Sequence, residues 1–147
     1  MRVSQILTSK RGDVVRVAPT ASVAMAIGLM RREHVGSILV LDEESRLVGV
    51  IDERDVVHGF ATNPDGLLER PVVELMRRDG PTAALDDTVQ SVLEIMTTSR
   101  SRHVPIVRHG RVVGIVSIGD IVKSRLDEKI QENTVLQEIA RAQFFAN

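Results

Sequence analysis

The chain has 147 residues, of which 43% are hydrophobic and 2% aromatic, and its formal net charge is -1. It contains no cysteine, which excludes disulfides, thiolate catalysis and cysteine-based zinc sites. The balanced charge and the scarcity of aromatic rings argue against nucleic-acid binding. No apolar run approaches the roughly 20 residues of a membrane helix, and residues 1–10 lack the apolar stretch of a signal peptide. We therefore expect a soluble, cytoplasmic protein with no nucleic-acid or membrane partner.

The first half of the chain predicts a strand, a helix, two strands and a second helix. Residues 14–17 alternate in polarity as a strand does. Ser22 has the residue type of a helix N-cap, and the helical spacing that follows is carried by Val23, Ala26, Ile27 and Met30. Residues 37–41 and 46–51 predict two strands joined by a turn. The second helix is expected to begin near Asp52.

The second half repeats the first. A turn at residues 63–66 opens a linker, and residues 71–76 echo the opening residues 3–7. Thr88 occupies the N-cap position, and the apolar stripe that follows is Val89, Val92, Leu93 and Met96. Residues 103–107 and 111–116 predict the two strands, with a hairpin one residue shorter than in the first half. The second helix is expected to begin near Ser117.

An internal repeat of this size determines the fold class. We expect an α/β (α+β) protein with two tandem β-α-β-β-α units, packed as a pseudo-twofold pair because neither unit can bury both sheet faces alone. The predicted boundaries are 1–62 for the first unit, 63–70 for the linker, 71–126 for the second unit and 127–147 for a C-terminal helical tail. Ile130, Leu136 and Ile139 give this tail a partial apolar stripe, which favours packing or dimerisation over catalysis.

One motif stands at both predicted strand-to-helix junctions. Residues 49–55 and 114–120 follow the pattern Gly-x-x-Ser/Thr-x-x-Asp, although the first copy carries Asp52 in place of the hydroxyl. A helix N-terminus suits phosphate, the hydroxyl of Ser117 can donate to it, and the carboxylate of Asp120 can accept from a ribose diol. The same residues also fit a capping box that satisfies only the helix itself. The motif alone leaves both interpretations open.

The surrounding strands add a resemblance. Residues 35–42 precede one motif and residues 102–107, with His-Val-Pro-Ile-Val, precede the other; residues 53–57 follow the first motif as Glu-Arg-Asp-Val-Val. Together these features resemble a tandem pair of cystathionine-β-synthase (CBS) domains of the small, stand-alone bacterial type, over residues 1–126. The resemblance implies a regulatory module and not an enzyme. It implies binding of AMP, ADP, ATP, NAD(H) or S-adenosylmethionine between the repeats, a homodimer, and an unknown regulated protein.

The resemblance also implies roles for individual residues. Asp120 and Asp55 would bind ribose, and Ser117 would contact ribose or phosphate. The pairs Val104-Pro105 and Ser37-Ile38 would border the bases, and the stretches near Val14 and Gly80 would form opposing walls. Arg102, His103 and Arg54 are either phosphate contacts or ordinary solvated surface.

The two predicted sites differ in charge. Asp52 and Asp55 place two carboxylates at one helix start, which repels phosphate. We therefore expect the Ser117/Asp120 site to bind nucleotide better. Two other functions remain as alternatives: a structural dimerisation module with unoccupied clefts, and a nucleotide-processing enzyme. The second is less favoured because the sequence shows neither a nucleophile with a base partner nor a metal triad.

Overall fold

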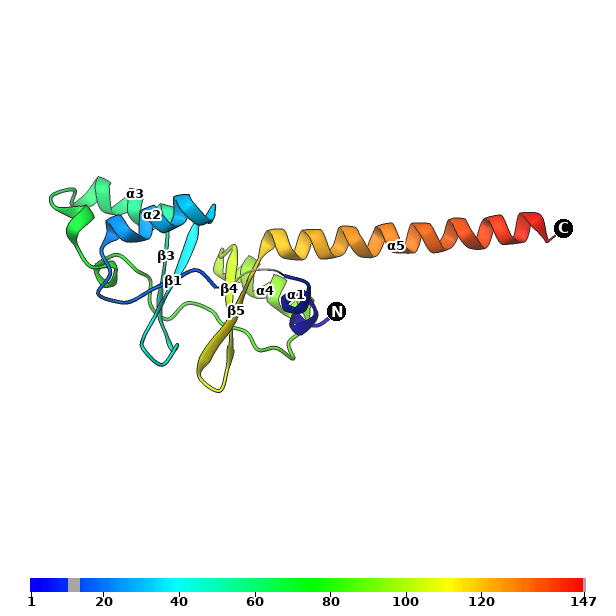
Figure 1. Ribbon diagram of the computed structural model, residues 1–147, viewed down its shortest axis with the longest axis horizontal. Helices are drawn as coiled ribbons and strands as arrows, with labels where there is room; N and C mark the ends of the chain where they lie inside the picture. The colour runs from blue at the N-terminus through cyan, green and yellow to red at the C-terminus, as the bar shows by residue number, and fades with distance from the viewer. Residues whose placement is uncertain (11–13, 147) are drawn as a thin grey trace.

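The two halves of the chain lie side by side, and a long helix projects from the second half (Figure 1). The computed structural model describes residues 1–10 and 14–146. After the N-terminal helix α1 (Val3–Ser9), the first half contains β1 (Arg16–Val17), α2 (Val23–Glu33), β2 (Ser37–Leu41), β3 (Leu47–Asp52) and α3 (Glu53–Thr62). Two 3-10 turns follow, η1 (Leu67–Glu69) and η2 (Val72–Glu74). The second half contains α4 (Val89–Ser99), β4 (His103–Arg108), β5 (Arg111–Ser117) and α5 (Ile118–Phe145).

The two sheets share one design. In the first half β1 pairs parallel with β2, and β2 pairs antiparallel with β3. In the second half β4 and β5 form the equivalent antiparallel pair, and a single parallel bridge from Ala83 to Ile106 stands where β1 stands in the first half. The strand predicted over residues 14–17 is shorter in the structure, because only Arg16 and Val17 make ladder pairs.

The predicted helix starts are confirmed by their capping contacts. The hydroxyls of Ser22 and Thr88 each accept a hydrogen bond from the backbone N–H three residues later, both at 3.1 Å. Both helices end in the left-handed conformation, with φ of 54° at His34 and 53° at Arg100. The duplicated sequence therefore specifies both ends of the equivalent helices α2 and α4.

The segments that open each half are exchanged between the two hydrophobic cores. Val3 and Ile6 of α1 pack in the core of the second half, with Val104 and Val116 among others. The later segment 72–76, which echoes α1 in sequence, packs through Val72 and Met76 in the core of the first half. The hydrophobic core of each half is therefore completed by a segment that precedes the other half in the sequence.

Two glycines permit this close packing. A Cβ added at Gly49 of β3 would lie 2.6 Å from Met76 Sδ and 2.9 Å from the carbonyl oxygen of Arg77. A Cβ added at Gly114 of β5 would lie 2.8 Å from two methyl carbons of Leu7. The glycine of each repeated motif is therefore where an exchanged segment crosses the strand.

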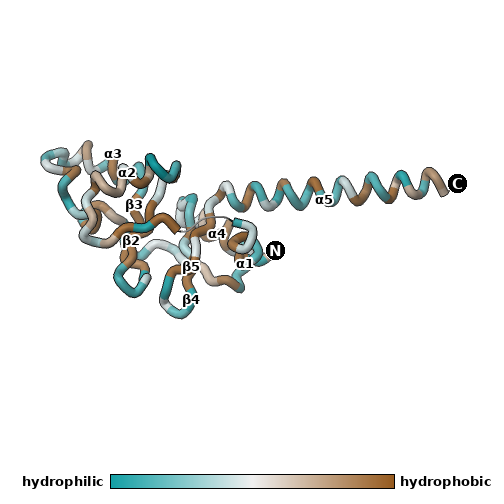
Figure 2. Tube along the Cα trace, in the orientation of Figure 1, coloured by the Kyte–Doolittle hydropathy of each residue, from teal (hydrophilic) through white to brown (hydrophobic). Residues whose placement is uncertain are grey.

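Helix α5 runs without a break from Ile118 to Phe145, so the helical tail expected from residue 127 continues the second helix of the second half. Its first turns contact α1, α4 and β5, and every residue from 125 to 146 is exposed. Hydrophobic and hydrophilic segments alternate along the projecting part (Figure 2). Within residues 1–10 and 14–146, no helix is both long and apolar enough to cross a membrane.

Candidate functional site

The two repeated motifs form matching capping boxes at the starts of α3 and α5. Ser117 Oγ accepts from the backbone N–H of Asp120 at 3.1 Å, and Asp120 Oδ2 accepts from the backbone N–H of Ser117 at 2.8 Å. Asp52 and Asp55 exchange the same two bonds, both at 2.9 Å. The capping interpretation is therefore correct for both copies. Because Ser117 Oγ acts as the acceptor in the capping box, the hydroxyl proton of Ser117 remains free to donate to another group.

Each box is paired with a cation that the sequence analysis did not identify. Lys10 Nζ donates to Asp120 Oδ2 and to the carbonyl oxygen of Ile115, both at 2.8 Å. Arg77 bridges both carboxylates of the other box, with Nη2 2.7 Å from Asp52 Oδ2 and Nε 3.2 Å from Asp55 Oδ1. The only feature of the sequence that points to these two cations is their position, since Lys10 follows α1 and Arg77 follows segment 72–76.

These ion pairs leave the two boxes with different charge and different ionisation. Asp120 with Lys10 is neutral, whereas Asp52 and Asp55 with Arg77 carry one net negative charge. Burial opposes the ionisation of Asp120, but the bonds from Lys10 and Ser117 outweigh it and hold the pKa of Asp120 below its ordinary value. Burial, reinforced by the charge of Asp52, raises the pKa of Asp55 despite the opposing contacts with the Asp52 backbone and Arg77.

The Ser117/Asp120 box opens into a cleft of about 950 Å³, which we call the large cleft. Its polar lining includes Lys10, Ser117 and Asp120, and also Arg16, Glu33 and His34. Apolar walls come from both halves of the chain and include Val14, Val15, Val35, Val112, Val113 and Ile115. Its volume lies within the roughly 300–1,000 Å³ of small-molecule sites.

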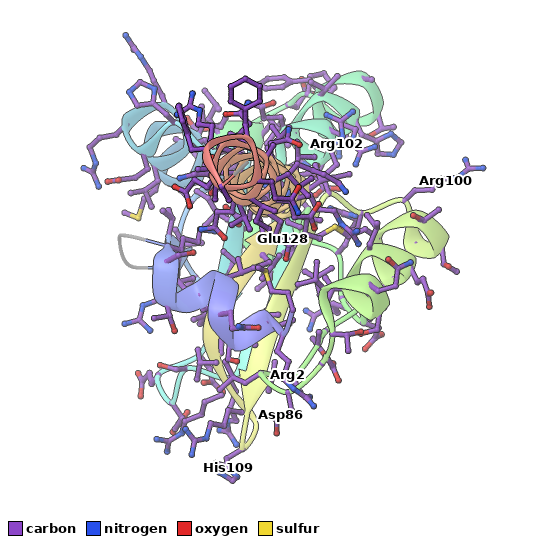
Figure 3. All side chains as sticks on the ribbon, turned by 90° about the vertical axis from the view of Figure 1, so that its right-hand side faces the viewer. Arg2, Asp86, Arg100, Arg102, His109 and Glu128 are labelled. Carbon is purple, nitrogen blue, oxygen red and sulfur yellow. The ribbon has the colours of Figure 1, made fainter. Side chains whose placement is uncertain are left out.

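The Asp52 side opens into a smaller cleft of about 210 Å³, which we call the small cleft. Three arginines line it, Arg54, Arg77 and Arg102, together with Asp52 and Glu53. Arg54 is 72% exposed and its Nη2 lies 3.8 Å from Asp52 Oδ2, so it adds little to the charge balance. Figure 3 labels Arg102 and shows Arg100, at the end of α4, pointing away from the protein.

The structure brings together most of the residues singled out in the sequence. The large cleft is lined by Val14, Ser37, His103, Ser117 and Asp120. The small cleft is lined by Ser37, Asp52, Arg54, Gly80, Arg102, His103 and Pro105. Asp55 contacts Arg77, which lines the small cleft, but does not line it itself.

Ile38 and Val104 differ from the expectation that they border a base. Both side chains are fully buried, Ile38 in the core of the first half and Val104 in the core of the second. They occupy strand positions that alternate toward the core, whereas their neighbours Ser37 and Pro105 face a cleft. Neither residue lines the large cleft or the small cleft.

Ser37 and His103 stand at equivalent positions of the repeat, at the starts of β2 and β4, and both line both clefts. Ser37 is 8% exposed, and its hydroxyl has no hydrogen-bond partner within the described part of the chain. Burial and the charge of Lys10 lower the pKa of His103 below its ordinary value. The phosphate contact that the resemblance implies for His103 stays a prediction.

Among residues 1–10 and 14–146, no group of three or more histidine and carboxylate side chains is placed to hold a metal ion. His109 stands at the tip of the β4–β5 turn (Figure 3).

The fold and the clefts define a tandem-repeat α/β protein whose two halves enclose sites suited to small molecules. The CBS domain profile matches residues 3–61 and 72–127, and the chain belongs to the CBS domain family. A CBS-domain containing protein from Agrobacterium tumefaciens is 35% identical with a TM-score of 0.80, over 85% of this chain and 99% of that one.

Two further solved structures of the family contain ligands. A CBS domain protein from Pyrobaculum aerophilum, complexed with AMP, is 26% identical with a TM-score of 0.73, over 82% of this chain and 89% of that one. The CBS domain pair of protein MJ0100, in complex with 5'-methylthioadenosine and S-adenosyl-L-methionine, is 28% identical with a TM-score of 0.74. That match covers 88% of this chain and 97% of the other.

Proposed function

We propose that this protein is a cytoplasmic regulatory module that binds an adenosine-containing ligand in the large cleft and acts as a homodimer without catalytic activity of its own. The observation that carries the proposal is the large cleft itself. It joins a helix N-terminus, a hydroxyl, a carboxylate and a lysine to apolar walls in one volume of about 950 Å³. The complexes of related proteins with AMP and with S-adenosyl-L-methionine support the ligand class.

The residues of the large cleft suit the parts of a nucleoside monophosphate. Asp120 is ionised at neutral pH, because its pKa is lowered, and accepts from the ribose hydroxyls. Ser117 Oγ donates to a ribose or phosphate oxygen, and Lys10 offers a charge to phosphate. The valines of the walls enclose the base. The hydroxyl of Ser37, which has no hydrogen-bond partner among residues 1–10 and 14–146, provides a further hydrogen bond where Ser37 lines the cleft.

The small cleft is the weaker site in this proposal. At about 210 Å³ it lies below the usual range for drug-sized ligands. Its carboxylate pair keeps one net negative charge after pairing with Arg77, which disfavours a phosphate close to the helix start. The physiological ligand, whether AMP, ADP, ATP, NAD(H) or S-adenosylmethionine, and the protein that is regulated are left to experiment.

Calorimetric titration with AMP tests the proposal. We compare the wild type with Asp120→Asn and with the matched variant Asp55→Asn. Loss of charge-assisted bonds to ribose should raise the Kd for Asp120→Asn by about 10- to 100-fold. Asp55→Asn should stay within about threefold of the wild type. If Asp55→Asn abolished binding while Asp120→Asn left it intact, the ranking of the two clefts would be wrong.

A thermal-shift screen separates the proposal from its two alternatives. A ligand at 100 times its Kd stabilises the folded state by about 2.7 kcal/mol, which raises Tm measurably. We expect such a shift with at least one of AMP, ATP, NADH and S-adenosylmethionine. No shift and no heat with any of them would favour a structural dimerisation module with empty clefts. Turnover of the nucleotide in a parallel hydrolysis assay would favour an enzyme.

A further inference from the structure

The ammonium group of Lys10 is held in the lining of the large cleft from two sides. Its Nζ donates to Asp120 Oδ2 and to the carbonyl oxygen of Ile115, both at 2.8 Å. Lys10 is also the C-cap of α1, and its backbone N–H donates to the carbonyl oxygen of Ile6, which is buried in the core of the second half. The position of this charge is therefore fixed by the docking of α1.

The bonds of the Ser117/Asp120 box leave two donors and one acceptor for an occupant of the cleft. An ammonium group has three N–H donors, and the two bonds of Lys10 use two of them. The hydroxyl proton of Ser117 is the second donor. Asp120 Oδ2 already accepts from Lys10 and from Ser117 N–H, whereas Asp120 Oδ1 accepts no hydrogen bond within residues 1–10 and 14–146. The one acceptor suits a hydroxyl group, and the two donors suit an anionic oxygen.

The other charged groups that line the large cleft are less well placed to act on a ligand. Arg16, Glu33 and His34 are all exposed, and the solvent screens such charges. Burial and the charge of Lys10 lower the pKa of His103, which disfavours its cationic form. The Lys10 side chain is 33% exposed and makes two bonds, so it is the cation whose position is best defined.

The charge that a ligand carries next to its ribose decides whether Lys10 assists or opposes binding. A phosphate accepts a charge-assisted hydrogen bond from the ammonium group. Adenosine carries no charge and gains no such bond. S-adenosyl-L-methionine carries a sulfonium beside the ribose, which the ammonium group repels.

We propose that Lys10 determines the ligand specificity of the large cleft by selecting adenosine ligands with an anionic group next to the ribose, such as AMP, over neutral or cationic adenosine derivatives. The inference rests on the proposed function and narrows its ligand class from any adenosine compound to a nucleotide. Lys10 belongs to the first half of the sequence, and the exchange of α1 brings it to the cleft residues of the second half.

Calorimetric titrations of the full chain with AMP and with adenosine, which differ only in the phosphate, test this role. The wild type should bind AMP at least about tenfold more tightly than adenosine. In Lys10→Met the Kd for AMP should rise until the two ligands bind within about threefold of each other, while the Kd for adenosine stays within about threefold of the wild type. Lys10→Arg keeps the charge and should retain a preference for AMP.

Lys123→Met is the matched control. Lys123 is exposed on α5, three residues after Asp120, and it lines a groove between α1 and α5 but not the large cleft. Its replacement removes the same charge from the same helix start, so the preference for AMP should match that of the wild type. An equal loss of preference in Lys123→Met and Lys10→Met would overturn the inference, because the general charge of the region would then be the cause.

The titrations separate failure of this inference from failure of the proposed function. Binding of neither ligand by the wild type overturns both. Binding of both ligands with a preference that survives in Lys10→Met overturns the specificity role of Lys10 alone. The same holds if Arg16→Met loses the preference and Lys10→Met keeps it, because the anionic group would then lie beside Arg16.

Lys10→Gln keeps the test decisive if Lys10→Met folds poorly. Glutamine removes the charge and retains an N–H donor for Asp120. Unchanged binding of adenosine shows that the cleft of each variant is intact. Loss of the preference for AMP in Lys10→Gln supports the inference, and a preference equal to that of the wild type overturns it.

Discussion

Replacement of Gly49 by alanine probes the packing that joins the exchanged segment to the first half. The added Cβ would lie 2.9 Å from the carbonyl oxygen of Arg77 and 2.6 Å from Met76 Sδ. That carbonyl is held in place, because Val50 N–H donates to it at 3.0 Å and Val50 oxygen accepts from Arg77 N–H at 2.9 Å. The methyl group can therefore be accommodated only by moving backbone.

The expected loss of stability follows from two effects of this backbone movement, overpacking and weaker hydrogen bonds. Overpacking a core costs about 1–3 kcal/mol, and weakening the two backbone bonds adds about 1 kcal/mol. Replacing a strand glycine by alanine also stabilises the protein by about 0.5–1 kcal/mol, because the unfolded chain has less conformational entropy to lose. We expect Gly49→Ala to lower the free energy of unfolding by about 2–3 kcal/mol.

The duplicated sequence supplies the matched control. A Cβ at Gly114 would meet only the side chain of Leu7, whose two methyl carbons, the nearest atoms at 2.8 Å, can rotate away. Gly114→Ala should therefore cost about 1 kcal/mol or less. Urea unfolding measures both, and with a slope of about 2 kcal/mol per molar the two midpoints should differ by about 0.5–1 M. Equal midpoints would refute the assignment of the Gly49 contact to rigid backbone.

Three further predictions concern the paired motifs and the helix caps. Lys10→Met should lower the free energy of unfolding by about 1 kcal/mol at pH 7. Because the folded-state pKa of Asp120 is lowered, this difference should be lost as the pH falls through that lowered pKa and Asp120 becomes protonated, which urea unfolding against pH detects. The pKa of Asp55 is raised instead, so the wild type loses stability as the pH rises and Asp55 ionises, whereas Asp55→Asn does not. The free energy of unfolding of Asp55→Asn should therefore rise relative to that of the wild type over this pH range. A difference between the two proteins that does not change with pH would contradict this. Ser22→Ala and Thr88→Ala should each cost about 1 kcal/mol by thermal unfolding, and a much smaller loss at either would mean that its cap bond contributes little.

The sequence by itself determined the elements and their repetition. The cap types at Ser22 and Thr88, the apolar spacing of α2 and α4, and the glycine motifs are all local signals, and local signals survive in any tertiary context. The same is true of the capping boxes at Asp52 and Ser117, since both partners lie three residues apart. The predicted strand over residues 14–17 was too long, because the sequence pattern cannot show where a neighbouring strand ends.

Tertiary structure alone decided what completes each half and each site. Nothing in the sequence indicates that α1 packs in the second core and segment 72–76 in the first. That exchange brings Lys10 to Asp120, 110 positions away in the chain, and Arg77 to the Asp52/Asp55 pair. The two carboxylates of Asp52 and Asp55, taken alone, predict plain repulsion of phosphate. In the structure the Asp52/Asp55 box with Arg77 keeps one net negative charge, and the Ser117/Asp120 box with Lys10 is neutral. The counterions Arg77 and Lys10 are brought in by long-range packing, so the local spacing of the motif cannot reveal them.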